Sequence, residues 1–203
     1  MKNALIITGG YLNFERINVS ADEYDIVIAA DSGYLSAAKL HIAPDIIVGD
    51  FDSAVRPNTN AEIITVPAEK DDTDTMLACS IAIKRGAAEL LILGGTGGRA
   101  DHFLSNLFLL ETFREQNIFA TLTDGENILR VLQNETVTIE NRGGYFSLFA
   151  LDECTVTLTD CKYPLNEFTL PHSNPSFAVS NEVVGEKATV TVKGKAILCE
   201  SVK

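Results

Sequence analysis

The stretch that decides the fold of this chain is Pro44-Asp45-Ile46-Ile47-Val48-Gly49-Asp50-Phe51-Asp52-Ser53. Its aliphatic run from Ile46 to Val48 is typical of a buried strand, and Gly49 ends that run. The carboxylates of Asp50 and Asp52 follow, and in an extended chain residues two apart point to the same side. At ~4 Å and an effective dielectric of ~20, two such charges repel by about 4 kcal/mol. Either one carboxyl is protonated or a cation lies between them, and Mg²⁺ is the natural candidate because it prefers oxygen ligands. A surface turn that caps a helix is the plainer alternative.

The composition is that of an ordinary globular protein. The chain has 203 residues, 46% of them apolar and 22% charged, which is enough for a sizeable core. Its net charge of −12 argues against nucleic acid or an anionic membrane as a partner. We find no leader pattern and no apolar stretch near the ~18 residues of a membrane span, so we expect a cytoplasmic protein. The four cysteines form no CxxC pair, which in that compartment predicts free thiols.

Apolar runs and helical segments alternate along the first two thirds of the chain. The runs cover residues 4–8, 25–30, 46–48, 61–66, 89–93 and 118–123, and helical spacing covers residues 35–40, 75–85 and 102–114. This alternation predicts a mostly parallel sheet between helices, an αβα arrangement. From about residue 133, short β-branched and aromatic runs separated by turn residues predict a smaller all-β sandwich. We therefore expect an α/β chain with two domains, residues 1–132 and residues 133–203.

Acidic residues gather in Lys70-Asp71-Asp72-Thr73-Asp74, directly before a helical segment. Asp72 or Thr73 is a plausible N-cap, and acids in a first helical turn suit the helix dipole. That structural role accounts for one or two of the three aspartates, and it leaves the rest for a binding site.

Glycines dominate Gly94-Gly95-Thr96-Gly97-Gly98-Arg99-Ala100-Asp101, between a predicted strand and a predicted helix. Glycine lets backbone N–H groups approach oxygens closely, and a helix N-terminus favours anions, so the segment suits phosphate. It is neither a Walker A loop nor a dinucleotide fingerprint. The structural alternatives are a tight packing turn for the glycines and a helix N-cap for Asp101.

Several polar segments follow predicted strands, and the carboxyl ends of parallel strands form one rim where ligands bind. These segments are Gly9-Gly10, Asp31, Asp50 with Asp52, and Gly94 to Arg99. A rim with so many acids repels itself when empty, which indicates a metal. Lys70 and Arg99 are the cations best placed to meet phosphate. The set indicates a divalent metal and a nucleotide, poised for phosphoryl-type transfer.

The ordered set of motifs resembles the thiamine pyrophosphokinase family, bacterial type, over nearly the whole chain. The motifs are Ala30-Asp31-Ser32-Gly33, the opening stretch, Lys70 to Asp74, Leu93 to His102, Lys162-Tyr163-Pro164-Leu165 and Val179-Ser180-Asn181-Glu182. The resemblance implies Mg²⁺-dependent transfer of the β,γ-diphosphate of ATP to the hydroxyethyl oxygen of thiamine, giving thiamine diphosphate and AMP. It also implies a nucleotide-binding first domain, a thiamine-binding second domain and a homodimer with composite sites. A β domain of about 70 residues would be marginal on its own.

Carried over motif by motif, the resemblance also implies roles for individual residues. Asp50, Asp52 and Asp74 would hold Mg²⁺, and Asp31 and Arg99 would complete the catalytic set. The residues expected to face ATP are Lys70, Asp71, Thr73, Gly94, Gly95, Gly97, Gly98, Arg99, Asp101 and Asn106. Tyr163, Ser180 and Asn181 would lie near thiamine, although an ordinary core or interface aromatic is an alternative for Tyr163.

Two other functions fit parts of the pattern. A haloacid-dehalogenase-type phosphatase is one, because Asp50-Phe51-Asp52 follows an apolar strand. That chemistry makes Asp50 a nucleophile and needs a covalent aspartyl-phosphate. A non-catalytic nucleotide-binding sensor is the other.

Overall fold

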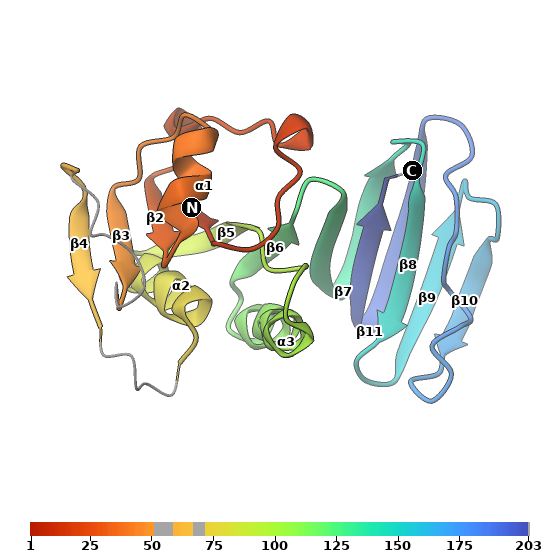
Figure 1. Cartoon of the computed structure of the whole chain (residues 1–203). Coiled ribbons are helices and arrows are strands. Elements are labelled where there is room, and N and C mark those ends of the chain that lie inside the picture. Colours follow the sequence, from red (N-terminus) through yellow and green to blue (C-terminus); the bar gives the residue numbers. More distant parts are fainter. Residues whose placement is uncertain (51–58, 67–71, 203) are drawn as a thin grey trace. The chain divides into compact units, whose positions relative to one another are not determined.

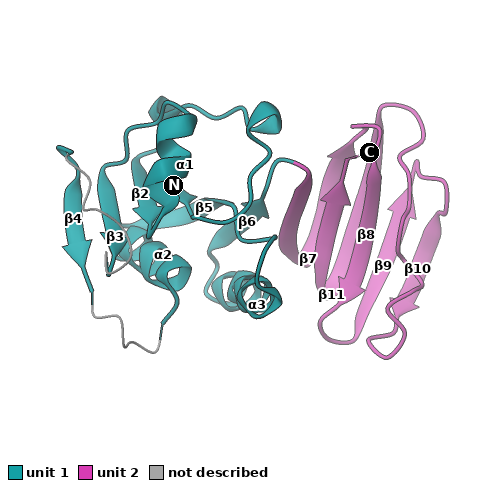
Figure 2. Cartoon of the chain, viewed as in Figure 1, with its two compact units in different colours: residues 1–125 teal, residues 126–203 magenta. Residues whose placement is uncertain are grey.

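A computed structural model of the chain describes residues 1–50, 59–66 and 72–202. It divides into two compact units, Met1–Gly125 and Glu126–Lys203 (Figure 2). The first unit alternates strands and helices and the second consists of strands, which confirms the predicted α/β class with a strand-rich second part (Figure 1). The division precedes the expected boundary at residues 132 and 133, which lies inside one continuous strand, β7 (Asn127–Glu140).

The first unit is built on a parallel sheet with the strand order β6-β5-β1-β2-β3-β4. Its strands are β1 (Lys2–Ile7), β2 (Ile26–Ala30), β3 (Ile46–Gly49), β4 (Glu62–Thr65), β5 (Ala87–Leu93) and β6 (Phe119–Thr123). The central strands are continuous aliphatic runs because both of their faces are covered. The run in β3 that opened the sequence analysis is buried throughout.

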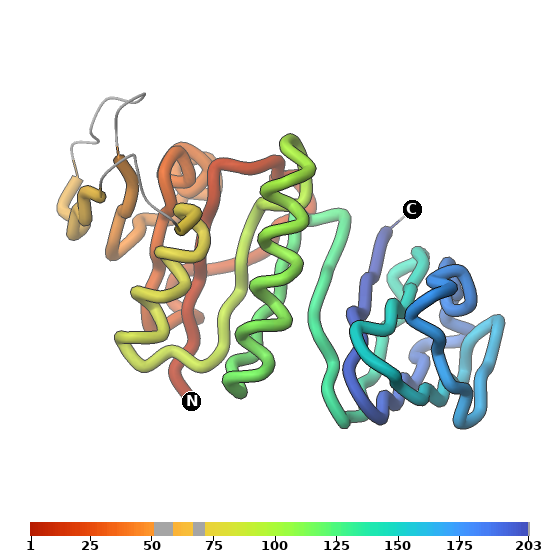
Figure 3. Tube along the Cα trace, turned by 90° about the horizontal axis from the view of Figure 1, so that it is seen from below, coloured from red at the N-terminus to blue at the C-terminus, as the bar shows by residue number. Residues whose placement is uncertain are grey.

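Three α-helices cover this sheet: α1 (Gly33–Lys39), α2 (Asp74–Lys84) and α3 (Ala100–Glu115). Helix α1 lies on one face, and α2 and α3 lie on the other (Figures 1 and 3). Between β1 and β2 the chain forms only two 3₁₀ turns, η1 (Phe14–Arg16) and η2 (Ala21–Glu23). No helix in the described part of the chain is long and apolar enough to cross a membrane.

The strand order places a topological switch point between β1 and β5. From β1 the chain builds the sheet outward through β2, β3 and β4, and it then returns to add β5 and β6 on the other side of β1. The carboxyl ends of β1 and β5 are joined by the backbone N–H of Thr8, which donates to the carbonyl of Leu93 at 2.9 Å. Open α/β sheets bind ligands at such a point, because the loops on its two sides diverge and leave a crevice.

The second unit is antiparallel throughout its described strands. These are β7, β8 (Tyr145–Ala150), β9 (Cys154–Thr159), β10 (Leu165–Leu170) and β11 (Lys187–Ser201). Strand β11 pairs with β7 along its length, with β9 in its first half and with β8 in its second half. The change of partner coincides with a register shift around Gly194, whose φ is 102°.

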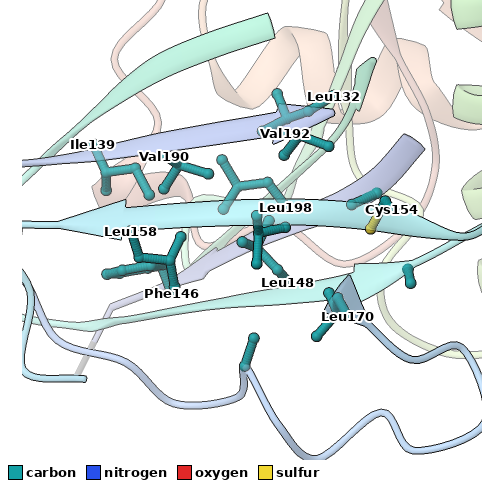
Figure 4. Packing of buried hydrophobic residues seen from close by; sticks show 14 of the residues in the cluster. Leu132, Ile139, Phe146, Leu148, Cys154, Leu158, Leu170, Val190, Val192 and Leu198 are labelled. Carbon is teal, nitrogen blue, oxygen red and sulfur yellow. The ribbon is translucent and has the colours of Figure 1, made fainter. Parts of the chain in front are cut away.

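A core of buried apolar side chains holds this second unit together. Side chains such as Leu132 from β7, Leu148 from β8, Leu158 from β9 and Leu198 from β11 point toward one another (Figure 4). All four cysteines of the chain are free thiols, as expected.

Candidate active site

The glycine-rich segment after β5 forms a tight loop at the switch point. Gly94, Gly95 and Gly98 have φ angles of 83°, 98° and 84°, a region that favours glycine. The loop after β1 packs directly against it, because a Cβ on Gly10 would lie 2.6 Å from the backbone nitrogen of Gly95. The side-chain amide of Asn106 on α3 donates to the carbonyl of Gly95 at 3.1 Å. The glycines therefore serve close packing and also leave backbone exposed to a ligand.

Two of the predicted acids lie at neighbouring strand ends. Asp31 follows β2, has a φ of 49°, and donates its backbone N–H to the carbonyl of Val48 in β3 at 2.7 Å. A Cβ added to Gly49 would lie 3.2 Å from the Cα of Asp31, so only glycine allows this approach without displacement. Asp50 comes immediately after Gly49. Asp31 and Asp50 thus stand side by side at the carboxyl edge of the sheet.

The start of α2 brings further polar groups to the same edge. The hydroxyl of Thr73 accepts the backbone N–H of Met76 at 3.2 Å, so Thr73, rather than Asp72, is the N-cap. Asp74 is the first residue of the helix, where its negative charge suits the helix dipole.

These segments surround a cavity of about 300 Å³ beyond the carboxyl ends of the strands. It brings together eight of the residues predicted from sequence: Asp31, Thr73, Asp74, Gly95, Gly97, Gly98, Arg99 and Asn106. Gly94 and Asp101 are sequence neighbours of lining residues, and Asp50 follows Gly49, which packs against Asp31; none of the three lines the cavity itself. Asp52, Lys70 and Asp71 lie outside the described residues.

The cavity also has lining residues that were given no individual ligand role, although Gly9 and Gly10 were predicted to lie on the rim. They are Thr8, Gly9, Gly10, Ala30, Ser32, Thr75 and His102. Most of them directly follow a strand or begin a helix, so the strand-end rule that selected Asp31 also selects Thr8 and Ser32. A Cβ on Gly9 would lie 1.9 Å from the hydroxyl oxygen of Ser32, which shows how closely the loops after β1 and β2 meet.

Arg99 and Asp101 form an exposed, two-point ion pair at the start of α3. The guanidinium Nε donates to Oδ1 of Asp101 at 3.1 Å, and Nη2 donates to Oδ2 at 2.6 Å. Chiefly through these hydrogen bonds, Arg99 lowers the pKa of Asp101 to about 2, and Asp101 in turn raises the pKa of Arg99. The N-cap of α3 is Arg99, so the N-cap alternative for Asp101 is wrong. Asp101 instead pairs with the guanidinium of Arg99, a residue that lines the cavity.

In the second unit, the three residues predicted to lie near thiamine have different environments. Tyr163 is 58% exposed, which contradicts the core alternative, and the Nζ of Lys162 lies 5.6 Å from its ring centroid. Ser180 has a φ of 57°, and its backbone N–H donates to the hydroxyl of Ser147 at 3.0 Å. Asn181 is 2% exposed.

The side chain of Asn181 holds the segment that carries Tyr163. Its Oδ1 accepts the backbone N–H groups of Tyr163 and Glu182 at 3.0 and 2.9 Å. Its Nδ2 donates to the carbonyl of Tyr163 at 2.9 Å and to the sulfur of Cys161 at 3.4 Å. The buried side chain is therefore engaged at both ends by the protein itself, and it fixes the backbone position of Tyr163.

Together, the fold and the cavity define a class: a doubly wound α/β unit with a glycine-rich, acid-lined cavity at its switch point, followed by an antiparallel β unit. The model of the thiamin pyrophosphokinase catalytic domain matches residues 18–122, and that of the thiamin pyrophosphokinase vitamin B1 binding domain matches residues 129–197. Thiamine pyrophosphokinase of Bacillus subtilis (strain 168) is 32% identical over 99% of both chains. The chain belongs to the thiamine pyrophosphokinase family, as its motifs predicted.

Solved structures agree with this placement. The crystal structure of thiamine pyrophosphokinase from Bacillus subtilis superposes with a TM-score of 0.85 at 29% identity, covering 100% of both chains. The structure of a thiamin pyrophosphokinase family protein from Enterococcus faecalis superposes with a TM-score of 0.84 at 30% identity, again over 100% of both chains.

Proposed function

We propose that the chain is an enzyme that transfers the β,γ-diphosphate of ATP to the hydroxyethyl oxygen of thiamine. The supporting observation is the cavity at the β1/β5 switch point, in a chain aligned over 99% of its length with a thiamine pyrophosphokinase. In the reaction, a bond forms between the thiamine hydroxyl oxygen and the β-phosphorus. The bond from the β-phosphorus to the oxygen bridging it to the α-phosphate breaks, the hydroxyl proton is released, and AMP leaves with the bridging oxygen.

The phosphates of ATP would lie on the glycine loop and the start of α3. Gly95, Gly97 and Gly98 line the cavity and have no side chains that would hinder an approaching oxygen. The N-terminus of the 16-residue helix α3 follows at once, and its dipole favours anions. The guanidinium of Arg99, held by Asp101, adds a fixed positive charge where negative charge builds during transfer.

The acids at the strand ends fit a magnesium ion that is shared with the nucleotide. Within the described ranges, no three acidic, histidine or cysteine side chains gather closely enough to hold a metal alone. Magnesium commonly binds to one or two protein carboxylates and takes its other ligands from phosphates and water. We assign it to Asp50 and Asp74, with Asp31 beside them and Asp52 beyond the described residues. When bound, the ion neutralises charge on the transferring phosphates.

Thiamine would be held by the second unit. The exposed ring of Tyr163 offers a π-face to a cationic thiazolium, a contact worth ~0.5–2 kcal/mol depending on burial. Ser180 and Asn181 complete this site, Asn181 by positioning the tyrosine.

Other apolar side chains of the unit are exposed as well, namely Tyr145, Phe177, Val179 and Val184. Because an all-β unit of this size is marginal alone, we propose that such surfaces pair two copies into a homodimer with composite sites. Light scattering at micromolar concentration tests this assembly.

To test the function, the protein is incubated with thiamine, Mg²⁺ and ATP labelled at the γ-phosphate, and the labelled product is identified. We expect the label in thiamine diphosphate, with AMP in equal amount. Thiamine monophosphate with ADP would contradict the proposal. Phosphate release without thiamine would indicate a phosphatase, and nucleotide binding without turnover would indicate a sensor.

Asp50→Asn and Asp74→Asn should each remove most turnover and leave the fold intact.

A further inference from the structure

The buried polar side chains of the first unit gather around the glycine loop. Within its described residues these are Thr8, Ser36, Asn106, Thr123 and Asp124, and only Ser36 lies elsewhere. Burying a polar group costs free energy unless it is hydrogen-bonded, so such a gathering marks a place where the backbone conformation is specified. The hydroxyl of Thr8 donates to the carbonyl of Leu93 at 3.0 Å, and the side-chain amide of Asn106 donates to the carbonyl of Gly95 at 3.1 Å.

Thr96 is the single residue with a side chain between Gly94 and Gly98. Gly95, Gly97 and Gly98 line the cavity, whereas Thr96 does not. Its hydroxyl donates instead to a carboxylate oxygen of Asp124, across 28 residues of sequence. The loop thus presents bare backbone to the cavity and uses its one side chain as an anchor behind it.

The main chain around Asp124 is itself held by hydrogen bonds. Asp124 directly follows β6 and is 3% exposed. Its backbone carbonyl accepts the N–H of Asn13 at 2.8 Å, and the carbonyl of Thr123 accepts the N–H of Gly94 at the same distance. The main chain that carries the carboxylate is therefore held at the end of β6, where it is joined to Asn13 and to the first residue of the glycine loop. A hydrogen bond to an ionised acceptor is roughly twice as strong as a neutral one, which suits the restraint of a glycine-rich segment.

We propose that Asp124 is a positioning residue for the diphosphate donor, acting through Thr96 on the Gly94–Gly98 loop. This inference rests on the proposed function, in which the loop carries the phosphates of ATP. Asp124 does not line the cavity, and its negative charge would repel a phosphate at short range. Asp124 therefore acts by ordering the loop before ATP binds. The binding of ATP then does not carry the entropy cost of ordering the loop.

The experiment compares full-length variants that lose or keep this hydrogen bond. Thr96→Val keeps the shape of the side chain and removes the donor, and Asp124→Ala removes the acceptor. Thr96→Ser and Asp124→Asn retain a donor and an acceptor. Thr112→Val is the matched control, since Thr112 is exposed on α3 and bonds only its own helix, at Phe108. The KM values for ATP and for thiamine, kcat and the thermal midpoint are measured for each variant.

We expect Thr96→Val and Asp124→Ala to raise the KM for ATP about tenfold, as for loss of a hydrogen bond to a charged group. The KM for thiamine should stay within about twofold, and the conservative variants should restore ATP binding. The double variant should be no worse than Asp124→Ala alone, because Thr96→Val then removes a contact that is already lost. Equal shifts in both KM values, additive losses, or a normal KM for ATP in Thr96→Val would overturn the proposal.

Hydrogen exchange separates this inference from the proposed function, because it needs no turnover. In Thr96→Val without nucleotide, the amides of residues 95–98 should exchange about tenfold faster than in the Thr112→Val control. Unchanged exchange there would refute the anchor even in a fully active enzyme. If wild-type protein forms no thiamine diphosphate while exchange still rises, the proposed function fails and the anchor stands. Should Asp124→Ala not fold, Thr96→Val carries the test alone.

Discussion

Replacing Asn181 with alanine should destabilise the second unit and weaken thiamine binding together. The side chain is 2% exposed. It accepts hydrogen bonds from the backbone N–H groups of Tyr163 and Glu182 and donates one to the backbone carbonyl of Tyr163. Its own backbone is paired with Phe146 of β8 at 2.9 Å in both directions. Asn181 therefore ties the segment that carries Tyr163 to the edge of the sheet, and alanine removes that tie.

The magnitude follows from the groups that lose partners. An unsatisfied buried polar group costs about 1–3 kcal/mol, and less where water can reach it. Tyr163 is exposed and Glu182 partly so, which lets water replace part of the loss. We therefore expect a fall of roughly 2–3 kcal/mol in the free energy of unfolding. Because the ring of Tyr163 is no longer held, the KM for thiamine should rise, while the KM for ATP should stay unchanged.

Urea unfolding followed by circular dichroism and tyrosine fluorescence measures the loss, since the chain has no tryptophan. Asn174→Ala is the matched control, because Asn174 is exposed and accepts a single 3.3 Å bond from the backbone of Ser176. It should cost less than about 0.5 kcal/mol. Asn181→Asp keeps the acceptor but turns a carboxylate oxygen toward the carbonyl of Tyr163, so it should not rescue. The reasoning is refuted if Asn181→Ala costs no more than the control, or if it moves both KM values equally.

Four further predictions concern the first unit and the thiols. Thr73→Ala removes the cap of α2 and should cost about 1 kcal/mol in urea unfolding, while Thr73→Ser should restore most of it. Arg99→Ala should lower turnover sharply and Arg99→Lys should restore it only in part, since lysine lacks the planar fork that Asp101 holds; full activity of the lysine variant would contradict this. The folded-state pKa of Asp101 is lowered to about 2, so its pair with Arg99 should persist above pH 4 and be lost as the pH falls toward 2, which a carboxyl NMR titration checks. Burial raises the pKa of Cys79 to about 12, so a thiol reagent at pH 8 should modify the partly exposed Cys199 first and reach Cys79 only in urea.

Much of the site was predictable because it obeys a local rule. A buried parallel strand is an unbroken aliphatic run, so the ends of β3 and β5 can be read from the sequence, and the polar residues that follow them belong to one rim. Asp31, Asp50 and the glycine loop were selected in this way, whereas Asp74 was selected from the acidic cluster before a predicted helix. Asp124 satisfies the same rule after β6, but nothing local distinguishes an acid that supports a loop from an acid in an ordinary turn.

The sequence by itself determined the alternation of strands and helices, the change to an all-β second part and the ordered motifs of the family, because each depends on neighbouring residues. Only the tertiary structure decided which distant groups meet. The hydrogen bond from Thr96 to Asp124 spans 28 residues, and that from Thr8 to Leu93 spans 85. The burial of Asn181 likewise depends on β8 and on the segment at Tyr163. Such contacts arise from strand order and packing, and a strand pairs by shape and hydrogen bonding with whichever partner the whole fold brings beside it.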